Sequence, residues 1–383
     1  MAEGISQTVS EQGIPTRDTH RDLDEARRAL EGWFAERLPD RDDFRLTGVE
    51  LPNTSGVANE TLLCDASWNE DGQSRSGGFV VRVHSPDFLY KDVDLRVHAD
   101  MYRALRDEPG IPVPAVIDYE SDASVLGQTF FVMERLHGQV PADTPPFHTT
   151  GWVRDLPPED RRALWRNGVE VMARLHQVPV HRFPFLQRPQ LGPDGLRQDM
   201  AYWFDYGEWA ARGRRHQVID PAARWLRDNA PDRTVTELSW GDSRLPNMMF
   251  RDLQVVSVFD WDMVSLAGAE SDLAWWTIMD FANTEAGGVE RLPGIGSPVE
   301  TIRLWQELTG REVHDIWFHL VYASYRMSVI LVRLGDLFAE GKMMPKEVTD
   351  EFVTNNLGIQ FLAQQLDIPH DRAIDMHWPG LEV

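Results

Sequence analysis

The strongest constraint on the fold is a change in hydrophobic patterning near Gly138. Residues 44–83 and 115–133 hold short apolar runs separated by turn residues, the pattern of antiparallel strands joined by hairpins. Amphipathic stretches with a helical period then follow at residues 158–177, 196–212 and 219–229, and the pattern of residues 270–383 is also largely helical. This order predicts an α+β protein with two lobes, a small antiparallel β-sheet lobe and a larger, mainly helical lobe.

We expect the chain to be organised in three segments. Residues 1–20 are polar without a periodic apolar face, which predicts a flexible tail. Residues 21–136 are expected to form the sheet-rich N-lobe, with helices near residues 22–38 and 93–105. Residues 137–383 are expected to form the helical C-lobe, which also contains a short β-rich island at residues 237–262.

Composition limits the possible partners. The chain has 38 basic and 61 acidic side chains and a formal net charge of −23, which argues against nucleic-acid binding because phosphates need a basic face. Its one cysteine, Cys64, excludes an intramolecular disulfide and a cysteine-cluster zinc site. No apolar run approaches the ~20 residues that span a bilayer, and Met1–Gly4 lacks the start of a signal peptide. We therefore expect a cytoplasmic location and no membrane partner; the oligomeric state stays open.

The β-rich island carries the candidate chemistry. Met248–Phe250 and Val255–Phe259 predict a hairpin, preceded by a polar loop that holds Asp242 and Asn247. Asp260 and Asp262 are expected at the end of the second strand, as alternate residues on one face. Carboxylate and amide oxygens that converge in this way suit Mg²⁺, and an acid left off the metal can accept a hydroxyl proton. The spacing therefore favours phosphoryl transfer.

These residues also carry a resemblance to a known family. Trp240-Gly241-Asp242 with Asn247, followed by Phe259-Asp260-Trp261-Asp262, resembles the aminoglycoside phosphotransferase and choline kinase-like family, whose usual pattern is His-Gly-Asp-x-x-x-x-Asn and then Ile-Asp-Trp-Glu. Trp240 stands where that family usually has histidine. The resemblance implies a protein-kinase-like fold, with Asp242 as catalytic base, Asn247 and Asp260 as Mg²⁺ ligands, Asp262 as an auxiliary acid near the metal, and Asp272 as a structural acid that ties down the loop.

The activity that the resemblance implies is Mg²⁺-dependent transfer of the γ-phosphate of ATP or GTP to a hydroxyl of a small molecule. The acceptor stays open, since relatives phosphorylate aminoglycosides, macrolides, choline, sugars and amino-acid derivatives. Trp240 and a missing helix glutamate leave a non-catalytic, pseudokinase-like nucleotide-binding module as the alternative. An acidic interaction protein without nucleotide is a third hypothesis.

The nucleotide side of the site is expected in the N-lobe. Gly56, Asn59 and Thr61 match the family's phosphate-covering turn, and Arg82 on an apolar strand looks like the arginine variant of the phosphate-holding lysine. The family's partner acid is missing, because Met101 or His98 stands where glutamate is common; Asp94 or Asp100 could substitute. Phe130–Gly138 looks like the family's hinge strand, so adenine is expected to pair with backbone groups near Glu134–Leu136, with Met133 packing close by.

Two further groups of residues complete the sequence-based hypotheses. Asp205, Tyr206, Glu208 and Tyr322 are candidates for lining the acceptor site on the helical lobe, because such a mixture of acids and aromatic rings can hold a cation or a hydroxylated molecule. His176 and His181 are separated by Pro179 and do not lie at i, i+4 spacing on one helix, so we expect structural roles rather than metal binding.

Overall fold

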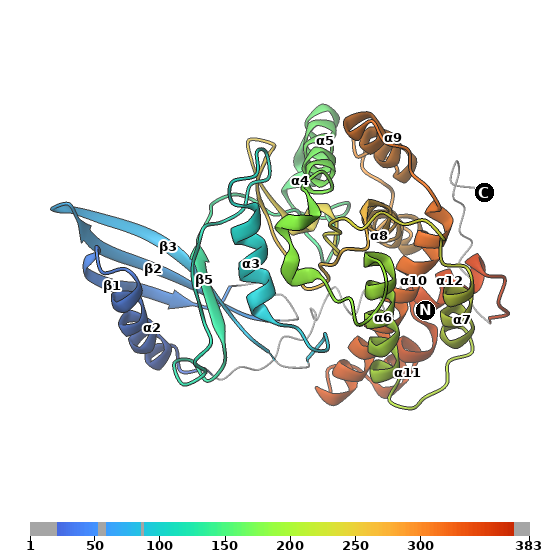
Figure 1. Ribbon diagram of the computed structural model, residues 1–383, viewed down its shortest axis with the longest axis horizontal. Helices are drawn as coiled ribbons and strands as arrows, with labels where there is room; N and C mark the ends of the chain where they lie inside the picture. The colour runs from blue at the N-terminus through green and yellow to red at the C-terminus, as the bar shows by residue number, and fades with distance from the viewer. Residues whose placement is uncertain (1–20, 53–58, 86–87, 371–383) are drawn as a thin grey trace. The chain divides into compact units, whose positions relative to one another are not determined.

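The computed structural model describes residues 21–52, 59–85 and 88–370. The chain divides into two compact units, the first ending at Gly138 and the second beginning at Gln139. We refer to the described residues of these units as the N-terminal unit and the C-terminal unit (Figure 1). The predicted tail, residues 1–20, lies outside the described residues.

The N-terminal unit is built on a five-stranded sheet in the order β1-β2-β3-β5-β4, in which every neighbouring pair is antiparallel. Asp71 and Gly72, both with positive φ, close the long β2–β3 hairpin. The predicted antiparallel sheet is confirmed. Its strands are β1 (Asp42–Glu50), β2 (Glu60–Glu70), β3 (Gln73–Val83), β4 (Val116–Glu120) and β5 (Phe130–Glu134).

Two helices pack against this sheet, α2 (Leu23–Arg37) and α3 (Leu95–Leu105). Asp22 caps α2, whose apolar stripe, including Trp33 and Phe34, is buried in one core with strand residues such as Phe130. Side chains alternate along a strand, so Phe131 points to the other face, where it meets Tyr102 of α3 at a ring distance of 6.0 Å. Both helices lie where the periodicity predicts them.

The C-terminal unit is mainly helical. Its long α10 is buried on nearly all sides and packs against α6, α7, α8, α11 and α12 (Figure 1). The α-helices are α4 (Trp152–Asp155), α5 (Pro158–Leu175), α6 (Gly195–Ala211), α7 (Ile219–Asp228), α8 (Ala269–Ala282), α9 (Pro298–Thr309), α10 (Ile316–Glu340), α11 (Lys346–Asn355) and α12 (Leu357–Gln365). Single 3₁₀ turns are η1 (Val180–Arg182), η2 (Pro184–Leu186), η3 (Leu245–Asn247) and η4 (Glu285–Gly287).

The predicted hairpin is present as β6 (Met248–Arg251) and β7 (Gln254–Val258). One detail of the prediction is wrong, because β7 ends at Val258 and Asp260 has a left-handed backbone with φ of 66°. Asp260 and Asp262 therefore do not alternate on a strand face. Phe259 still bonds across to the opposite strand, since its backbone N–H donates to the carbonyl of Asn247 at 3.1 Å, and the extended backbone stops at the left-handed residue Asp260.

Within residues 21–52, 59–85 and 88–370, we find no helix with the length and hydropathy needed to cross a bilayer.

Candidate active site

The loop that carries Asp242 depends on one glycine. Gly241 has φ of +95°, and a Cβ at this position would lie 2.1 Å from the carbonyl oxygen of Met263. Any side chain would therefore be both strained and in collision with backbone. The chain next makes the single turn η3, in which Pro246 pre-sets the backbone and Asn247 comes back toward Asp242. The tight turn thus converts a spacing of five residues into direct contact.

The carboxylate of Asp242 is buried, with 7% of the residue exposed, and is held from three sides. Asn247 donates from Nδ2 to Oδ2 at 2.6 Å and to the backbone carbonyl of Asp242 at 2.9 Å. Trp275 of α8 donates from Nε1 to Oδ1 at 2.6 Å, and Arg244 donates from Nε to both oxygens at 3.0 Å. Charge-assisted bonds of this kind fix the orientation of an acid before any ligand binds.

Arg244 joins two acids, since its Nε bonds Asp242 and its Nη1 bonds Asp143. Burial opposes the charged form of the guanidinium, but the carboxylates of Asp143 and Asp242 outweigh it and raise the pKa of Arg244. The guanidinium stays charged at all relevant pH values. The buried acid therefore has a permanent counter-charge beside it.

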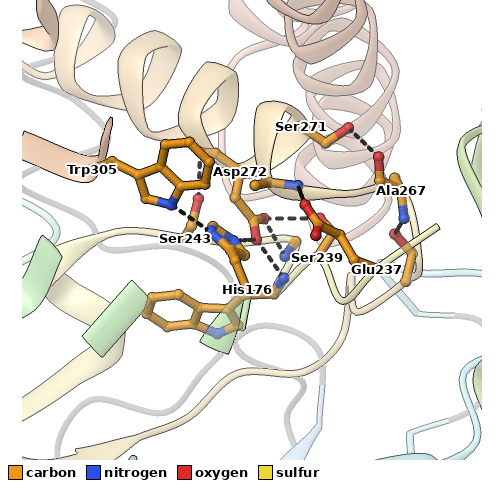
Figure 2. Close-up of polar contacts among 12 residues, drawn as sticks. His176, Glu237, Ser239, Ser243, Ala267, Ser271, Asp272 and Trp305 are labelled. Carbon is orange, nitrogen blue, oxygen red and sulfur yellow. Dashed lines mark hydrogen bonds and ion pairs between the residues drawn. The ribbon is translucent and has the colours of Figure 1, made fainter. Parts of the chain in front are cut away.

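Asp272, near the start of α8, ties the loop to the helix (Figure 2). Its Oδ1 accepts from Ser239 Oγ at 2.9 Å and from the backbone N–H of Gly241 at 2.8 Å, and its Oδ2 accepts from the backbone N–H of Trp240 at 2.6 Å. His176 Nε2 lies 2.8 Å from Oδ2 as well. The predicted structural role of Asp272 is confirmed.

His176 is part of the same support. Trp305 donates from Nε1 to Nδ1 of His176 at 2.9 Å, so Nδ1 is the acceptor and Nε2 carries the proton donated to Asp272 (Figure 2). Both side chains of the His176–Asp272 pair are fully buried. The predicted structural role of His176 is confirmed, and the histidine anchors α5 to the loop.

Trp240 links the loop to the segment that holds Asp260. Its indole Nε1 donates to the carbonyls of Phe259 at 3.0 Å and Asp260 at 3.2 Å, and its ring lies 6.2 Å from that of Trp261. The predicted bracing by packing and one N–H donor is therefore confirmed. Asp260 lies beside the loop that holds Asp242 and Asn247, and its Oδ1 accepts from the backbone N–H of Asp262 at 3.3 Å.

The donor set fits a hard divalent cation that shares its coordination with a phosphorylated ligand. Both hydrogen bonds from the Asn247 amide leave through Nδ2, so its oxygen Oδ1 faces away from Asp242. In the part of the chain that the structure describes, no group of three or more histidine, cysteine, aspartate or glutamate side chains could hold a metal by itself. Mg²⁺ is commonly bound through only one or two carboxylates together with phosphate oxygens and water. Asn247 and Asp260 match that pattern.

Comparison with known proteins identifies the family. A model of the phosphotransferase enzyme family, APH, matches residues 52–296. The chain belongs to this family. Among curated proteins it is similar to acyl-CoA dehydrogenase family member 11 of Rattus norvegicus, with 28% identity over 281 residues. That match covers 70% of the chain but only 33% of the rat protein, so the chain spans about a third of that relative's length.

Solved structures show the same fold. A putative aminoglycoside phosphotransferase from Ralstonia eutropha superposes with a TM-score of 0.62 and 21% identity, covering 88% of this chain and 98% of that one. ADP-bound aminoglycoside phosphotransferase APH(2″)-Ib gives a TM-score of 0.52 at 14% identity, covering 88% and 98%. The predicted α+β, protein-kinase-like fold is confirmed.

The nucleotide-side predictions fall on the N-terminal unit. Arg82 on β3 lies opposite Thr61 on β2 and donates to its Oγ1 at 2.9 Å. Among the described residues Arg82 makes no ion pair; Asp94 caps α3 and Asp100 bonds Arg103 instead. Asn59 is buried and its Oδ1 accepts from the backbone N–H of Ser85 at 3.3 Å. Gly56 lies outside the described residues.

The predicted hinge follows β5. The backbone N–H groups of Glu134 and Arg135 donate to Ala115 and Gly78, each at 2.9 Å. The backbone N–H of Leu136 makes no hydrogen bond with any residue that the structure describes. Met133 is half-buried on β5. A role for this N–H group in binding a ligand stays a prediction.

The four acceptor-site candidates differ in exposure. Tyr206 and Tyr322 are fully buried, and Tyr322 donates from its hydroxyl to Asp199 Oδ2 at 2.8 Å. Asp205 and Glu208 are exposed on α6. The two tyrosines pack between helices, and a role for these residues at an acceptor site stays a prediction.

Sequence reasoning missed three residues of the site: Arg244, Asp143 and Trp275. Arg244 could have been found, because a cation two residues after Asp242 in a tight loop reaches the acid directly. Asp143 lies in a proline-containing loop with nothing to single it out. The sequence could not assign Trp275 to the site. Helix α8 is buried on nearly every side, so its sequence does not show which face meets the loop.

Proposed function

We propose that this chain transfers the γ-phosphate of ATP or GTP to a hydroxyl group of a small molecule, with Mg²⁺. Family membership supports phosphotransferase chemistry in general. The observation that carries the specific proposal is the pairing of Asp242 with Asn247 at 2.6 Å, with Asp260 held beside them through Trp240. One acid, one amide oxygen and a second acid are the groups that this chemistry requires.

Asp242 acts on the acceptor. It orients the hydroxyl and accepts its proton, while Trp275 and Arg244 hold the carboxylate in place. Because phosphoryl transfer passes through a loose transition state, orientation contributes more than strong basicity, which is compatible with an acid that has an arginine beside it.

Asn247 and Asp260 hold the cation, and Asp262 assists next to Asp260. When bound, Mg²⁺ neutralises charge on the nucleotide phosphates. The chain's own contribution is to present the amide oxygen of Asn247 and the carboxylate of Asp260 in a pre-formed loop, so that little reorganisation is needed.

Residues 21–136 bind the nucleotide and residues 137–383 carry the catalytic loop and the acceptor site. Arg82 contacts phosphate oxygens, and the turn with Gly56 and Asn59 covers them. Adenine packs near Met133 and bonds the backbone between Glu134 and Leu136, which is supported by the unused N–H of Leu136. ADP in the fold relative APH(2″)-Ib supports a nucleotide as the ligand.

The acceptor is a hydroxyl-bearing small molecule with Asp205, Tyr206, Glu208 and Tyr322 as candidate contacts. The relatives differ in their names, one an acyl-CoA dehydrogenase family member and others aminoglycoside phosphotransferases. An acceptor screen that includes both acyl-CoA derivatives and aminoglycosides follows from these names.

The test is turnover and nucleotide binding of Asp242→Ala. We expect ADP release on a responsive acceptor to fall by about 10²–10⁴-fold, with Mg-ATP affinity by calorimetry changed less than about threefold. Asp228→Ala, an exposed acid on α7, is the matched control and should retain full turnover. Undiminished turnover in Asp242→Ala would show that Asp242 is not the base.

A non-catalytic nucleotide-binding module is the second candidate. It is favoured by Arg82, which has no acidic partner among the residues described here. Mg-ATP binding without ADP release on any acceptor in the screen supports this module. No thermal shift with ATP, GTP and Mg²⁺ would contradict both candidates.

A further inference from the structure

A groove with an excess of arginines lies in the C-terminal unit, away from the Asp242 loop. It has a volume of about 460 Å³ and is lined by the second half of α6, by residues 213–216, by α7 and by α10. This volume lies in the range of small-molecule sites. No residue of the loop that carries Asp242 and Asn247 lines it. We call it the arginine groove.

The arginine groove is distant from the loop along α6. Gly195, at the start of α6, packs against Leu266, where a Cβ would lie 1.9 Å from the Leu266 carbonyl oxygen. Gly207, which lines the groove, is twelve residues further on, or about 18 Å along the helix. The groove is therefore a separate site rather than an extension of the Asp242 loop.

The charge of the groove is opposite to that of the whole chain. Its lining contains four arginines, Arg214, Arg215, Arg224 and Arg227, and two acids, Glu208 and Asp220, while the chain carries −23. Such a local inversion concentrates anions at one place on an acidic protein.

Two of the four arginines are already neutralised. Arg214 donates from Nη1 and Nη2 to the two oxygens of Asp336, each at 2.7 Å. Arg215 is highly exposed and lies 3.5 Å from Asp220. These pairs close the end of the groove, because Arg214 also bonds the last carbonyls of α6, and they contribute little net charge.

The other two arginines keep their charge for a ligand. Arg224 and Arg227 are three residues apart and lie on one face of α7. Arg224 makes no hydrogen bond or ion pair with any part of the chain that the structure describes. Arg227 is placed 4.0 Å over the ring of Phe204, which holds its guanidinium at the groove wall. Glu208 is the one acid left to oppose them among the described lining residues, so the excess is one positive charge.

His216 adds no charge to this balance. Burial, together with Arg214, lowers the pKa of its imidazole, so it is neutral at pH 7. The remaining wall is apolar, formed by Phe204 together with Tyr325, Val329 and Val332 of α10. The groove thus offers the guanidinium groups of Arg224 and Arg227 along one wall, next to an aromatic and aliphatic surface.

We propose that the arginine groove is a second ligand site that binds an organic anion with one negatively charged group and an apolar body. The anionic group lies between Arg224 and Arg227, where two guanidinium groups share it. The apolar body lies on Phe204 and on the α10 side chains. The proposal needs neither nucleotide nor phosphoryl transfer, although Glu208 of the groove wall is also one of the candidate acceptor contacts.

The probe for the test is 1-anilinonaphthalene-8-sulfonate, an aromatic monoanion whose fluorescence rises in apolar surroundings. We expect saturable binding of one equivalent to the folded full chain. N-phenyl-1-naphthylamine has the same aromatic body without the sulfonate. Its affinity should be lower than that of the sulfonate probe by about tenfold or more. Inorganic sulfate, which has the charge without the body, should displace the probe only at much higher concentration.

Three variants identify the site. Arg224→Gln with Arg227→Gln should weaken binding about tenfold or more, and Glu208→Gln should strengthen it because it removes the opposing charge. Arg166→Gln, on an exposed position of α5 outside the groove, should bind as the unmodified chain does. Any one of three results would overturn the proposal. The neutral probe could bind as tightly as the sulfonate probe, the double variant could keep full affinity for the sulfonate probe, or Arg166→Gln could lose as much affinity as the double variant. Melting temperatures of all variants show that each is folded.

Discussion

The indole of Trp275 and the carboxylate of Asp242 are joined by a hydrogen bond of 2.6 Å from Nε1 to Oδ1. The ring of Trp275 is in turn covered by the buried guanidinium of Arg326, 4.8 Å from its centroid. Arg326 Nε and Nη1 have no hydrogen-bond partner among the described residues, and the same guanidinium also faces Tyr322 and Trp203. The aromatic faces stabilise this cation. Orientation of Asp242 thus depends on α8 and α10 as well as on its own loop.

Trp275→Phe tests this dependence. The change keeps most of the packing and removes the N–H donor, and a hydrogen bond to a charged group contributes about 1.5–3 kcal/mol. We expect the rate of ADP release to fall about 10–100-fold, with Mg-ATP affinity unchanged in calorimetry. Trp276→Phe is the matched control, because Trp276 is also buried in α8 and, unlike Trp275, makes no hydrogen bond to Asp242. Equal rates in the two variants would contradict the role of Trp275.

Gly241→Ala tests the geometry of the loop. At Gly241 a Cβ would lie 2.1 Å from a backbone oxygen, whereas at Gly213, also with positive φ, it would meet nothing within 4 Å. Gly213→Ala therefore measures left-handed backbone strain alone, about 1 kcal/mol of unfolding free energy. We expect Gly241→Ala to lose about 3 kcal/mol or more in urea unfolding, because backbone cannot move aside cheaply. A similar loss in the two variants would mean that the loop can relax around a side chain.

Asp272→Asn tests the support beneath the loop. The buried carboxylate accepts from two backbone N–H groups, from Ser239 and from His176, and an amide places two hydrogens where donors already point. We expect the free energy of unfolding to fall by about 3 kcal/mol. Ser243→Ala removes only the bond to the backbone carbonyl of Asp272, 2.7 Å long, and should cost about 1 kcal/mol. Unfolding by denaturant measures both variants. If Asp272→Asn lowers the free energy of unfolding no more than Ser243→Ala does, Asp272 is not the main support of the loop.

The low pKa of buried His319 predicts that the protein loses stability in acid. Burial, with a smaller effect of Arg326, lowers the pKa of His319 from 6.5 to about 3. The unfolded chain therefore binds more protons below pH 6.5, and the free energy of unfolding falls as the pH drops from 6.5 toward 3, by up to about 1.4 kcal/mol per pH unit. His319→Gln should flatten the curve of unfolding free energy against pH measured at pH 7, 6 and 5.

The control for this pH series is His181→Gln, which changes an exposed histidine. His148, whose pKa is lowered to about 4 by burial and by Arg291, leaves a second contribution in the His319→Gln variant. We therefore expect a reduced slope rather than a flat line. Parallel curves for His319→Gln and the unmodified chain would show that His319 does not set the acid sensitivity.

The order of sheet and helices and the hairpin after the Asp242 loop follow from local information, whereas the structural role of Asp272 was implied by the family resemblance. Alternating apolar residues bounded by turn residues predict strands, and apolar stripes with a helical period predict surface helices. A spacing of five residues across a loop that contains glycine and proline also limits how far apart Asp242 and Asn247 can lie. The end of β7 was missed because the sequence around Phe259 and Asp260 does not show the left-handed backbone that Asp260 adopts.

The sequence by itself determined the class of fold and the residues of the loop, because short-range spacing and hydrophobic period do not depend on distant partners. Only the tertiary structure decided that Trp275 reaches Asp242, that Arg326 covers Trp275, and that Arg224 and Arg227 face a groove between α6, α7 and α10. Helices buried on nearly all sides, such as α8 and α10, show no amphipathic stripe, so their rotation about their own axes is set by packing against the rest of the unit.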